Sequence, residues 1–318
     1  MKRINILSLT QVFVIALITV VLLLSGCEAI FEETIDIPDK EFLKVLKREG
    51  VTNNNFLTIE EAEAVLELDI STHCLEYEGG GGGVLICNKW DFIVSNLEGI
   101  EYFSNLKSLT CRRTDLTELN LSQNTALESL ECSNNEKLET LILSSNDNLT
   151  YLTCEGNGLI GLDVSGCTSL EQMGIGGNSK LTSLILPDSL KGLNCYSNAL
   201  TSLDVSGCKG LIGLVCVDNQ LTSLDVSNNA TLMGMECWRN QLTDLDVSNN
   251  PDLVELICGD NQLTSLDISK NTKLESIGIM DMPTLNEVCV WTLPFPPEGV
   301  EVNTEGSPNV YFTTECGK

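Results

Sequence analysis

Apolar and polar positions along this chain follow a unit of about 21 residues that returns from Leu106 to Ile279. The clearest copies read L-x-x-L-x-C-x-x-N-x-L-T-x-L-D-V-S-x-N. The sixth position forms a cysteine column: Cys111, Cys132, Cys154, Cys195, Cys216, Cys237 and Cys258, with Ile175 and Ile279 in two further turns. A fixed period in the twenties, with leucine at fixed offsets, is typical of a leucine-rich-repeat solenoid of stacked turns.

The two leucines and the cysteine of L-x-x-L-x-C are predicted to point inward and to stack on the same residues of neighbouring turns. The second half of the unit, L-T-x-L-D-V-S-x-N, alternates as a strand does, so we predict a short extended segment on the opposite side and little helix. The asparagine at the ninth position can satisfy backbone groups where the chain turns. It recurs as Asn135, Asn157, Asn178, Asn198, Asn219, Asn240 and Asn261.

Two short helices are predicted before the repeats. The first begins at Asp39, places Phe42, Val45 and Leu46 on one face and ends at Gly50. The second begins at Thr58, with Glu61 completing a capping box. We expect both to cover the open end of the solenoid.

Leu66, Leu68 and Ile70 are predicted to form the first strand. A glycine-rich insertion follows, with Gly79–Gly83 as a loop between Cys74 and Cys87. The segment between the helices faintly resembles a calcium loop, but Thr52 and Leu57 stand where Asp and Gly are needed. A plain loop is the favoured interpretation.

The N-terminus indicates export. Lys2 and Arg3 precede an apolar stretch, Val12–Leu24, that is short for a membrane span and suits a signal peptide. Leu24-Ser25-Gly26-Cys27 resembles the lipobox of bacterial lipoproteins, which implies cleavage before Cys27 and lipidation of Cys27. An uncleaved N-terminal anchor is the alternative. Glu28, Glu32 and Glu33 loosely resemble the export signals of surface lipoproteins in Bacteroidetes, which implies the outer face of the outer membrane.

The mature chain is strongly acidic. Without Lys2 and Arg3, 16 basic residues stand against 45 acidic ones, a net charge of −29. Such a surface repels nucleic acid and anionic lipid and favours cationic partners or divalent ions.

Most of the 14 cysteines are predicted to be free, although disulfides are common in exported proteins. Cysteines one turn apart lie about 4.8 Å apart with parallel Cβ directions, whereas a disulfide needs Cβ atoms about 3.8 Å apart and converging. Cys167 and Cys208 lie two turns apart, roughly 10 Å, which is too far for a bond. Two pairs stand outside the repeats, Cys74 with Cys87 and Cys289 with Cys316, and we predict both to be disulfides.

The cysteine-bearing unit and its L-D-V-S-x-N run resemble the cysteine-ladder leucine-rich repeats of internalin J-like proteins and of many secreted lipoproteins of Bacteroidetes. The resemblance covers roughly residues 94–285, and Cys289 and Cys316 resemble the paired cysteines of a C-terminal cap. It implies a surface protein, commonly an adhesin. Ile175, Ile279 and the turn at Pro187, which is one residue short, depart from the pattern.

We therefore expect five segments: a signal peptide at 1–26, an acidic tether at 27–36, a helical N-terminal cap with the glycine-rich insertion at 37–93, the solenoid at 94–285 and a C-terminal cap at 286–318.

An apolar cluster is predicted on the outward positions of the front strands, toward the C-terminal half. With Arg239 and Asp260 at its edge, its members are Tyr196, Val215, Val217, Trp238, Ile257 and Met280. Exposed apolar patches often mark contact sites, and Trp, Tyr and Arg dominate binding hot spots. The alternative is that strand surfaces simply tolerate such residues.

An acidic row is predicted on the opposite side, at Asp163, Asp204, Asp225, Asp246 and Asp267. Like charges in adjacent turns repel, so Ser or Thr partners or ions should relieve them. A row of calcium sites is less favoured than a solvated ridge, because one carboxylate per turn falls short of the six to eight oxygens that calcium takes.

Catalytic, metal and cofactor sites are not predicted. The single histidine, His73, excludes a histidine-dependent triad in practice, and we find no nucleophile elbow or phosphate-binding loop. We expect a non-enzymatic, lipid-anchored, monomeric surface protein that binds a protein, glycoprotein or polysaccharide through the front face. A structural envelope scaffold and a cryptic glycan hydrolase are the alternatives.

Overall fold

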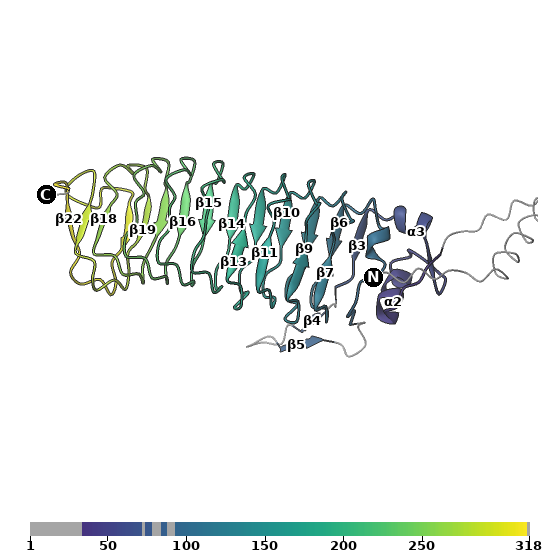
Figure 1. Cartoon of the computed structure of the whole chain (residues 1–318). Coiled ribbons are helices and arrows are strands. Elements are labelled where there is room, and N and C mark those ends of the chain that lie inside the picture. The colour runs from purple at the N-terminus through teal and green to yellow at the C-terminus, as the bar shows by residue number, and fades with distance from the viewer. Residues whose placement is uncertain (1–33, 72–73, 78–83, 88–92, 317–318) are drawn as a thin grey trace, which may run out of the picture. The chain divides into compact units, whose positions relative to one another are not determined.

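Each turn of the repeat contributes a three-residue strand to one parallel sheet that runs along the solenoid (Figure 1). The computed structural model describes residues 34–71, 74–77, 84–87 and 93–316. In spatial order the eleven strands of this front sheet are β3 (Glu67–Asp69), β6 (Ser108–Thr110), β8 (Ser129–Glu131), β10 (Tyr151–Thr153), β12 (Gln172–Gly174), β14 (Gly192–Asn194), β15 (Gly213–Val215), β16 (Gly234–Glu236), β17 (Glu255–Ile257), β19 (Ser276–Gly278) and β21 (Glu301–Asn303).

The inward positions form a dry stack along the whole sheet, as the repeat predicts. Register is kept from turn to turn, so that Leu193 pairs with Leu214 and Leu214 with Met235. All seven column cysteines are free thiols and fully buried. Ile175 and Ile279, which take the same position in two turns, are fully buried as well. A single turn cannot bury this apolar surface, and the stacked turns bury it together. The leucine-rich-repeat solenoid is therefore confirmed.

The second half of each unit forms the opposite side of the coil, without a helix. Its strands are β7 (Glu118–Asn120), β9 (Thr140–Ile142), β11 (Gly161–Asp163), β13 (Ser183–Ile185), β18 (Ser265–Asp267), β20 (Glu287–Cys289) and β22 (Tyr311–Thr313). In the middle copies the corresponding residues, 202–204, 223–225 and 244–246, are not assigned to a strand. The predicted short extended segment is thus present, with strand pairing in some turns.

The ninth-position asparagines close one corner of the coil, as predicted. Asn219 Nδ2 donates to the carbonyl oxygens of Cys195 and Cys216 at 2.9 and 3.2 Å, and its Oδ1 accepts from the backbone N–H of Leu200. The same arrangement recurs at the other members of the column, so each side chain ties two turns together.

A second asparagine ladder closes another corner, at Asn124, Asn146, Asn229, Asn250 and Asn271. Here the amide nitrogen donates to backbone carbonyls, while the buried Oδ1 has no partner among the described residues. Cys167 and Cys208 take this position in two turns, and their thiols donate to the carbonyl oxygens of Leu143 and Pro187 at 3.4 Å. A cysteine can replace asparagine here because the side chain at this position acts only as a hydrogen-bond donor, and a thiol can donate.

The predicted cap helices are present at the N-terminal end. Helix α2 (Lys40–Arg48) has Asp39 as N-cap and buries Phe42, Val45 and Leu46. Helix α3 (Ile59–Glu63) begins after Thr58, with the capping box to Glu61 formed. Strands β1 (Thr34–Ile35) and β2 (Leu57–Thr58) pair beside them, and a 3-10 helix, η1 (Ile100–Tyr102), follows the insertion. Ile35, at the end of the predicted tether, is buried in this region.

The first strand, β3 (Glu67–Asp69), is shorter than the predicted segment and excludes Leu66 and Ile70. Leu68 and Ile70 are buried, whereas the side chain of Leu66 is 50% exposed. In L-x-x-L-x-C the first leucine position lies three residues before the second. In this turn it is Val65, which packs against the core.

The coil continues beyond Leu285, the boundary assigned from the sequence. Strand β21 pairs with β19 and β22 pairs with β20, so both sides extend into the C-terminal cap. Cys289 and Cys316 are joined by a disulfide, with their Cα atoms 5.6 Å apart. Phe295 packs between Trp291 and Phe312, at ring-centroid distances of 5.2 and 4.8 Å.

The signal peptide, Cys27 and most of the predicted tether lie outside the described residues, as do His73 and Gly79–Gly83. Strands β4 (Cys74–Tyr77) and β5 (Val84–Cys87) pair antiparallel with Cys74 opposite Cys87, and the disulfide between them stays a prediction. Within the described ranges, no helix is long and apolar enough to cross a membrane.

Candidate ligand-binding face

The outward positions of the front sheet form a face whose C-terminal half is rich in apolar side chains. Tyr196, Val215, Trp238, Ile257 and Met280 are all partly exposed there, on or directly after strands β14 to β19. Because the strands are parallel and in register, equivalent residues of adjacent turns lie about 4.8 Å apart. The structure therefore places these predicted residues on one face.

Val217 differs from this expectation, since only 8% of its side chain is exposed. It occupies the turn between Tyr196 and Trp238, in the same column. A small side chain between two larger aromatic ones offers little surface to a ligand. The alternation of inward and outward positions could not reveal this shielding.

Tyr196 lies across the neighbouring turn. A Cβ atom at Gly176 would collide with its ring, so only glycine leaves the ring room there. Burial, together with the charge and hydrogen bond of Glu155, raises the pKa of the Tyr196 phenol. Tyr196 is thus held in place by residues from two earlier turns.

An apolar edge of this face was missed by the sequence analysis. Ile212 and Met233, just before β15 and β16, are 45% and 48% exposed, and Val254 follows in the next turn. A Cβ at Gly213 or Gly234 would meet nothing within 4 Å, so the surface beside them is open. The signal was present in the sequence, because the same column reads Lys107, Glu128, Thr150, Glu171 and Lys191 in earlier turns.

A hollow of about 570 Å³ lies at the C-terminal end of the face. We call it the C-terminal groove, and it is lined by Trp238, Arg239, Asp260, Met280, Asp281, Asn303, Glu305 and Gly306. Trp238, Gly259 and Met280 occupy one column of three successive turns, and Gly259 has no side chain to fill its position. A Cβ at Gly259 would lie 2.7 Å from Met280 Sδ, which shows that Met280 leans across this gap.

Arg239 stacks on Trp238 at the rim of the groove. Its guanidinium carbon is 4.5 Å from the centre of the ring, and its Nε is 3.8 Å from Asp260 Oδ2. Arg239, Asp260 and Asp281 all have left-handed backbones, with φ of 55°, 49° and 55°. This conformation, rare for residues other than glycine, recurs two positions after the cysteine column and turns each strand into the corner.

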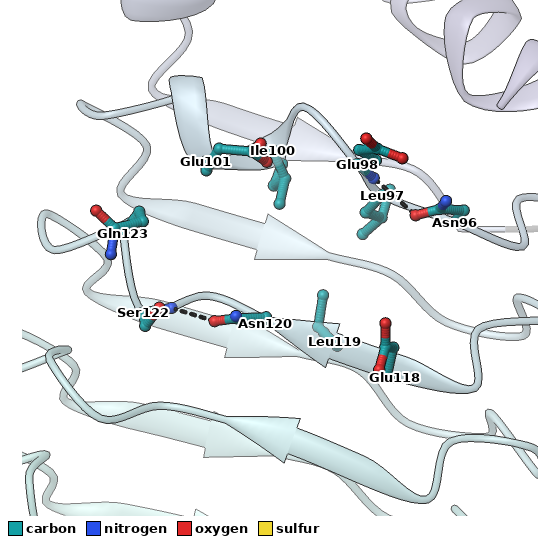
Figure 2. A pocket seen from close by; sticks show the side chains of 10 residues that line it. All are labelled: Asn96, Leu97, Glu98, Ile100, Glu101, Glu118, Leu119, Asn120, Ser122 and Gln123. Carbon is teal, nitrogen blue, oxygen red and sulfur yellow. Dashed lines mark hydrogen bonds between the residues drawn. The ribbon is translucent and has the colours of Figure 1, made fainter. Parts of the chain in front are cut away.

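A second hollow, of about 450 Å³, lies near the N-terminal cap and includes residues of β7 (Figure 2). Its rim holds Glu98, Glu101 and Glu118. Two of its polar side chains are used in local turns, since Asn96 Oδ1 accepts from the backbone N–H of Glu98 and Asn120 Oδ1 from that of Ser122. These bonds shape the loops around the hollow.

The acidic row on the opposite side caps the turns that follow it. In each copy the carboxylate accepts from the serine two residues later, as Asp204 Oδ1 does from Ser206 N at 2.9 Å and Ser206 Oγ at 2.6 Å. These serine hydrogen bonds lower the pKa of Asp163, Asp204, Asp225 and Asp246. The serine partners predicted to relieve the row are therefore present.

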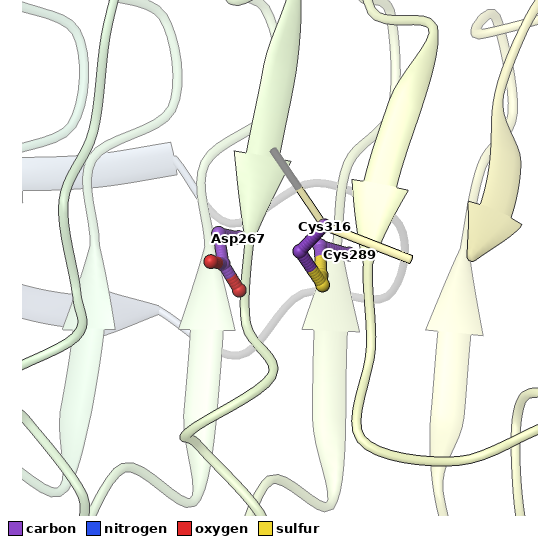
Figure 3. Close-up of side chains that lie close together, drawn as sticks. All are labelled: Asp267, Cys289 and Cys316. Carbon is purple, nitrogen blue, oxygen red and sulfur yellow. A yellow bond between two sulfur atoms is a disulfide. The ribbon is translucent and has the colours of Figure 1, made fainter. Parts of the chain in front are cut away.

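Asp267, the last of the row, lies beside the disulfide (Figure 3). One of its carboxylate oxygens and the sulfurs of Cys289 and Cys316 lie within 4.8 Å of one another. The two sulfurs are bonded to each other, so they offer no thiolate to a metal ion, and one carboxylate remains.

The free thiols are unsuited to catalysis. All nine of the described free cysteines are buried, and burial raises the pKa of Cys216 and Cys258 to about 12. Thiolates are the reactive form, so these groups are inert at neutral pH.

No protein-family model and no curated protein sequence matches the chain. Solved structures do match it. The functional domain of InlJ from Listeria monocytogenes, described as including a cysteine ladder, aligns with 88% of this chain at 27% identity and a TM-score of 0.61. The chain covers 63% of that domain, less than two thirds of its length.

Two further internalins of Listeria monocytogenes are more distant. Internalin C2 aligns with 78% of this chain and 97% of its own, at 20% identity and a TM-score of 0.46. An internalin named InlF aligns with 92% and 100%, at 16% identity and a TM-score of 0.41. The likeness to InlJ and the buried cysteine column together identify the fold as a leucine-rich-repeat solenoid with a cysteine ladder.

Proposed function

We propose that this leucine-rich-repeat protein with a cysteine ladder is a non-enzymatic recognition protein of the cell surface, which binds a protein, glycoprotein or polysaccharide ligand through its front face. The observation that carries the proposal is the run of partly exposed apolar side chains along this face, from Tyr196 to Met280. A solenoid offers an extended regular surface to a ligand. Apolar patches of this kind are typical of contact sites.

Tyr196 and Trp238 are the aromatic residues of the face that we expect to contribute most to ligand binding. Tyr196 packs over Gly176 and Trp238 is stacked under Arg239, so each ring has a neighbour that restrains it. Ordered aromatic side chains lose little conformational entropy on binding, which favours affinity.

The test uses the mature fragment that begins at Glu28, in a glycan array and in a pull-down of surface proteins. The variant Tyr196→Ala with Trp238→Ala should lose at least tenfold in affinity for whatever ligand is found. The control variant, Tyr102→Ala with Tyr311→Ala, removes two exposed aromatic rings that lie outside the front sheet and should bind normally. Unchanged binding by the first variant would contradict the proposal.

The same experiment separates the two alternatives. A structural envelope scaffold would bind a protein of the same cell and ignore host ligands. A cryptic hydrolase would turn over a labelled polysaccharide, and this turnover would be lost when paired carboxylates on one face are neutralised.

We also propose that a lipid on Cys27 holds the protein on the outer membrane, and that it acts there as a monomer. The lipobox-like Leu24-Ser25-Gly26-Cys27 supports the anchor. Cells fed radiolabelled palmitate should label the wild-type protein and not Cys27→Ala, which should also leave the membrane fraction. Equal labelling of the two would refute the anchor.

A further inference from the structure

The C-terminal groove combines an aromatic wall with unbalanced negative charge. Trp238 and Met280 lie in one column two turns apart, and the Met280 side chain reaches over Gly259 between them. Trp238 and Met280 therefore form one apolar wall of the groove. Its remaining lining is polar, with the carboxylates of Asp260, Asp281 and Glu305 around it.

These carboxylates outnumber the cations of the groove. Arg239 is the one basic residue of the lining, and it lies near Asp260. Across the described parts of the chain, no lysine or arginine forms an ion pair with Asp281 or Glu305. Three carboxylates against one guanidinium leave a local charge of −2, which attracts a further cation.

Arg239 shows which cation this surface accommodates. Its guanidinium lies on the Trp238 ring at 4.5 Å and near a carboxylate at 3.8 Å. Stacking on an indole combined with a nearby carboxylate is the recognition that arginine side chains favour. A second guanidinium or ammonium group in the groove would meet the carboxylates of Asp281 and Glu305, with the apolar Met280 side chain beside them.

We propose that the C-terminal groove binds an arginine or lysine side chain presented by a partner polypeptide. This inference rests on the proposed recognition function and selects a protein with a basic segment among its possible ligands. The charge of the mature chain, −29, steers such a partner toward the molecule. The groove supplies the specific contact, since it adds an apolar wall to that general attraction.

The probe is a fluorescein-labelled hexa-arginine peptide, with hexa-lysine and hexa-glutamine for comparison, measured by fluorescence anisotropy in 0.15 M salt. The arginine and lysine peptides should bind the mature fragment, and the glutamine peptide should not. The variant Asp281→Asn with Glu305→Gln should weaken binding of hexa-arginine at least tenfold. Asparagine tolerates the left-handed backbone at position 281, so the corner is preserved.

A control of equal charge removes the effect of general attraction. Asp204→Asn with Asp225→Asn also deletes two negative charges, on the opposite side of the coil, and keeps an oxygen for Ser206 and Ser227. Its affinity for hexa-arginine should stay within twofold of the wild type. Circular dichroism melting of both variants checks that the fold is intact.

Equal weakening in the two variants, or weakening in neither, would overturn the inference. In that event the front face can still be the recognition surface, provided that Tyr196→Ala with Trp238→Ala abolishes binding of a captured ligand. Conversely, a captured ligand that binds this aromatic variant normally contradicts the proposed function, whatever the peptides do. The failures of the two proposals are thus distinguishable.

Discussion

Asn229 donates its side-chain N–H to the carbonyl oxygen of Cys208 at 2.8 Å, one turn earlier at the same position of the repeat. It also donates to the carbonyl oxygen of Val205 at 2.9 Å. The carbonyl oxygens of Val205 and Cys208 also accept a backbone N–H each, so the buried amide gives both a second donor and joins two turns. The stacked turns depend on such bridges as well as on apolar packing.

Replacing Asn229 should therefore destabilise the solenoid. Asn229→Ala removes two side-chain hydrogen bonds to buried carbonyl oxygens, which costs about 1–3 kcal/mol of unfolding free energy at about 0.5–1.5 kcal/mol for each bond. The matched control is its neighbour, since Asn228 is exposed and Asn228→Ala should change stability by less than about 0.5 kcal/mol. Urea denaturation of both variants measures the difference, and equal midpoints would contradict the bridging role.

Stability should fall at alkaline pH because of the cysteine ladder. Burial raises the pKa of Cys216 and Cys258 to about 12 from an ordinary 9.0. Between these values the unfolded chain loses the protons while the folded chain keeps them. The free energy of unfolding should then decrease by up to about 1.4 kcal/mol per pH unit for each thiol as the pH rises above 9.

Denaturation midpoints at pH 8 and pH 10.5 measure this loss. The variant Cys216→Ala with Cys258→Ala starts less stable but should show a shallower decline, because two of the titrating thiols are gone. A wild-type midpoint that stays constant over this range would argue against buried, protonated thiols.

Replacing Arg113, which has a left-handed backbone, with glycine should stabilise the fold. Arg113 has a φ of 54°, a conformation that costs an L-residue about 1–2 kcal/mol, whereas glycine adopts it freely. Glycine also makes the unfolded chain more flexible, at about 0.5–1 kcal/mol, so Arg113→Gly should raise stability by roughly 0.5 kcal/mol. Arg112, which pairs with Glu131, is the neighbouring control, and Arg112→Gly should lower stability. The explanation fails if both substitutions have the same sign in thermal denaturation.

Calcium should leave the acidic row unaffected. The carboxylates of Asp204 and Asp225 already accept hydrogen bonds from Ser206 and Ser227, and each turn offers a single carboxylate. Calcium prefers six to eight oxygen ligands, so the row serves as a set of turn caps. Thermal unfolding with 5 mM calcium chloride and with 5 mM magnesium chloride should give the same Tm. A rise specific to calcium would restore the calcium interpretation.

The coil and its buried contacts could be predicted from the sequence, but the exposure of individual side chains on the front face could not. The cysteine and asparagine columns were predictable because each turn must repeat the same buried contacts at the same offset, as Cys237 and Asn240 do. The first strand was predicted too long, from Leu66 to Ile70, because apolar alternation continues beyond the three residues that pair with the next turn. The shielding of Val217 and the reach of Met280 over Gly259 depend on side-chain conformations in neighbouring turns, which no single repeat encodes.

The most direct test of the account places the ligand on the front face by observing Trp238 itself. The chain has three tryptophans, Trp90, Trp238 and Trp291, so protein labelled with 5-fluorotryptophan should give three fluorine resonances that substitution to Phe assigns one by one. Adding a ligand found in the binding screen should shift or broaden the resonance of Trp238 and leave that of Trp291 unchanged. A saturated complex in which the Trp238 resonance does not move would contradict recognition through this face.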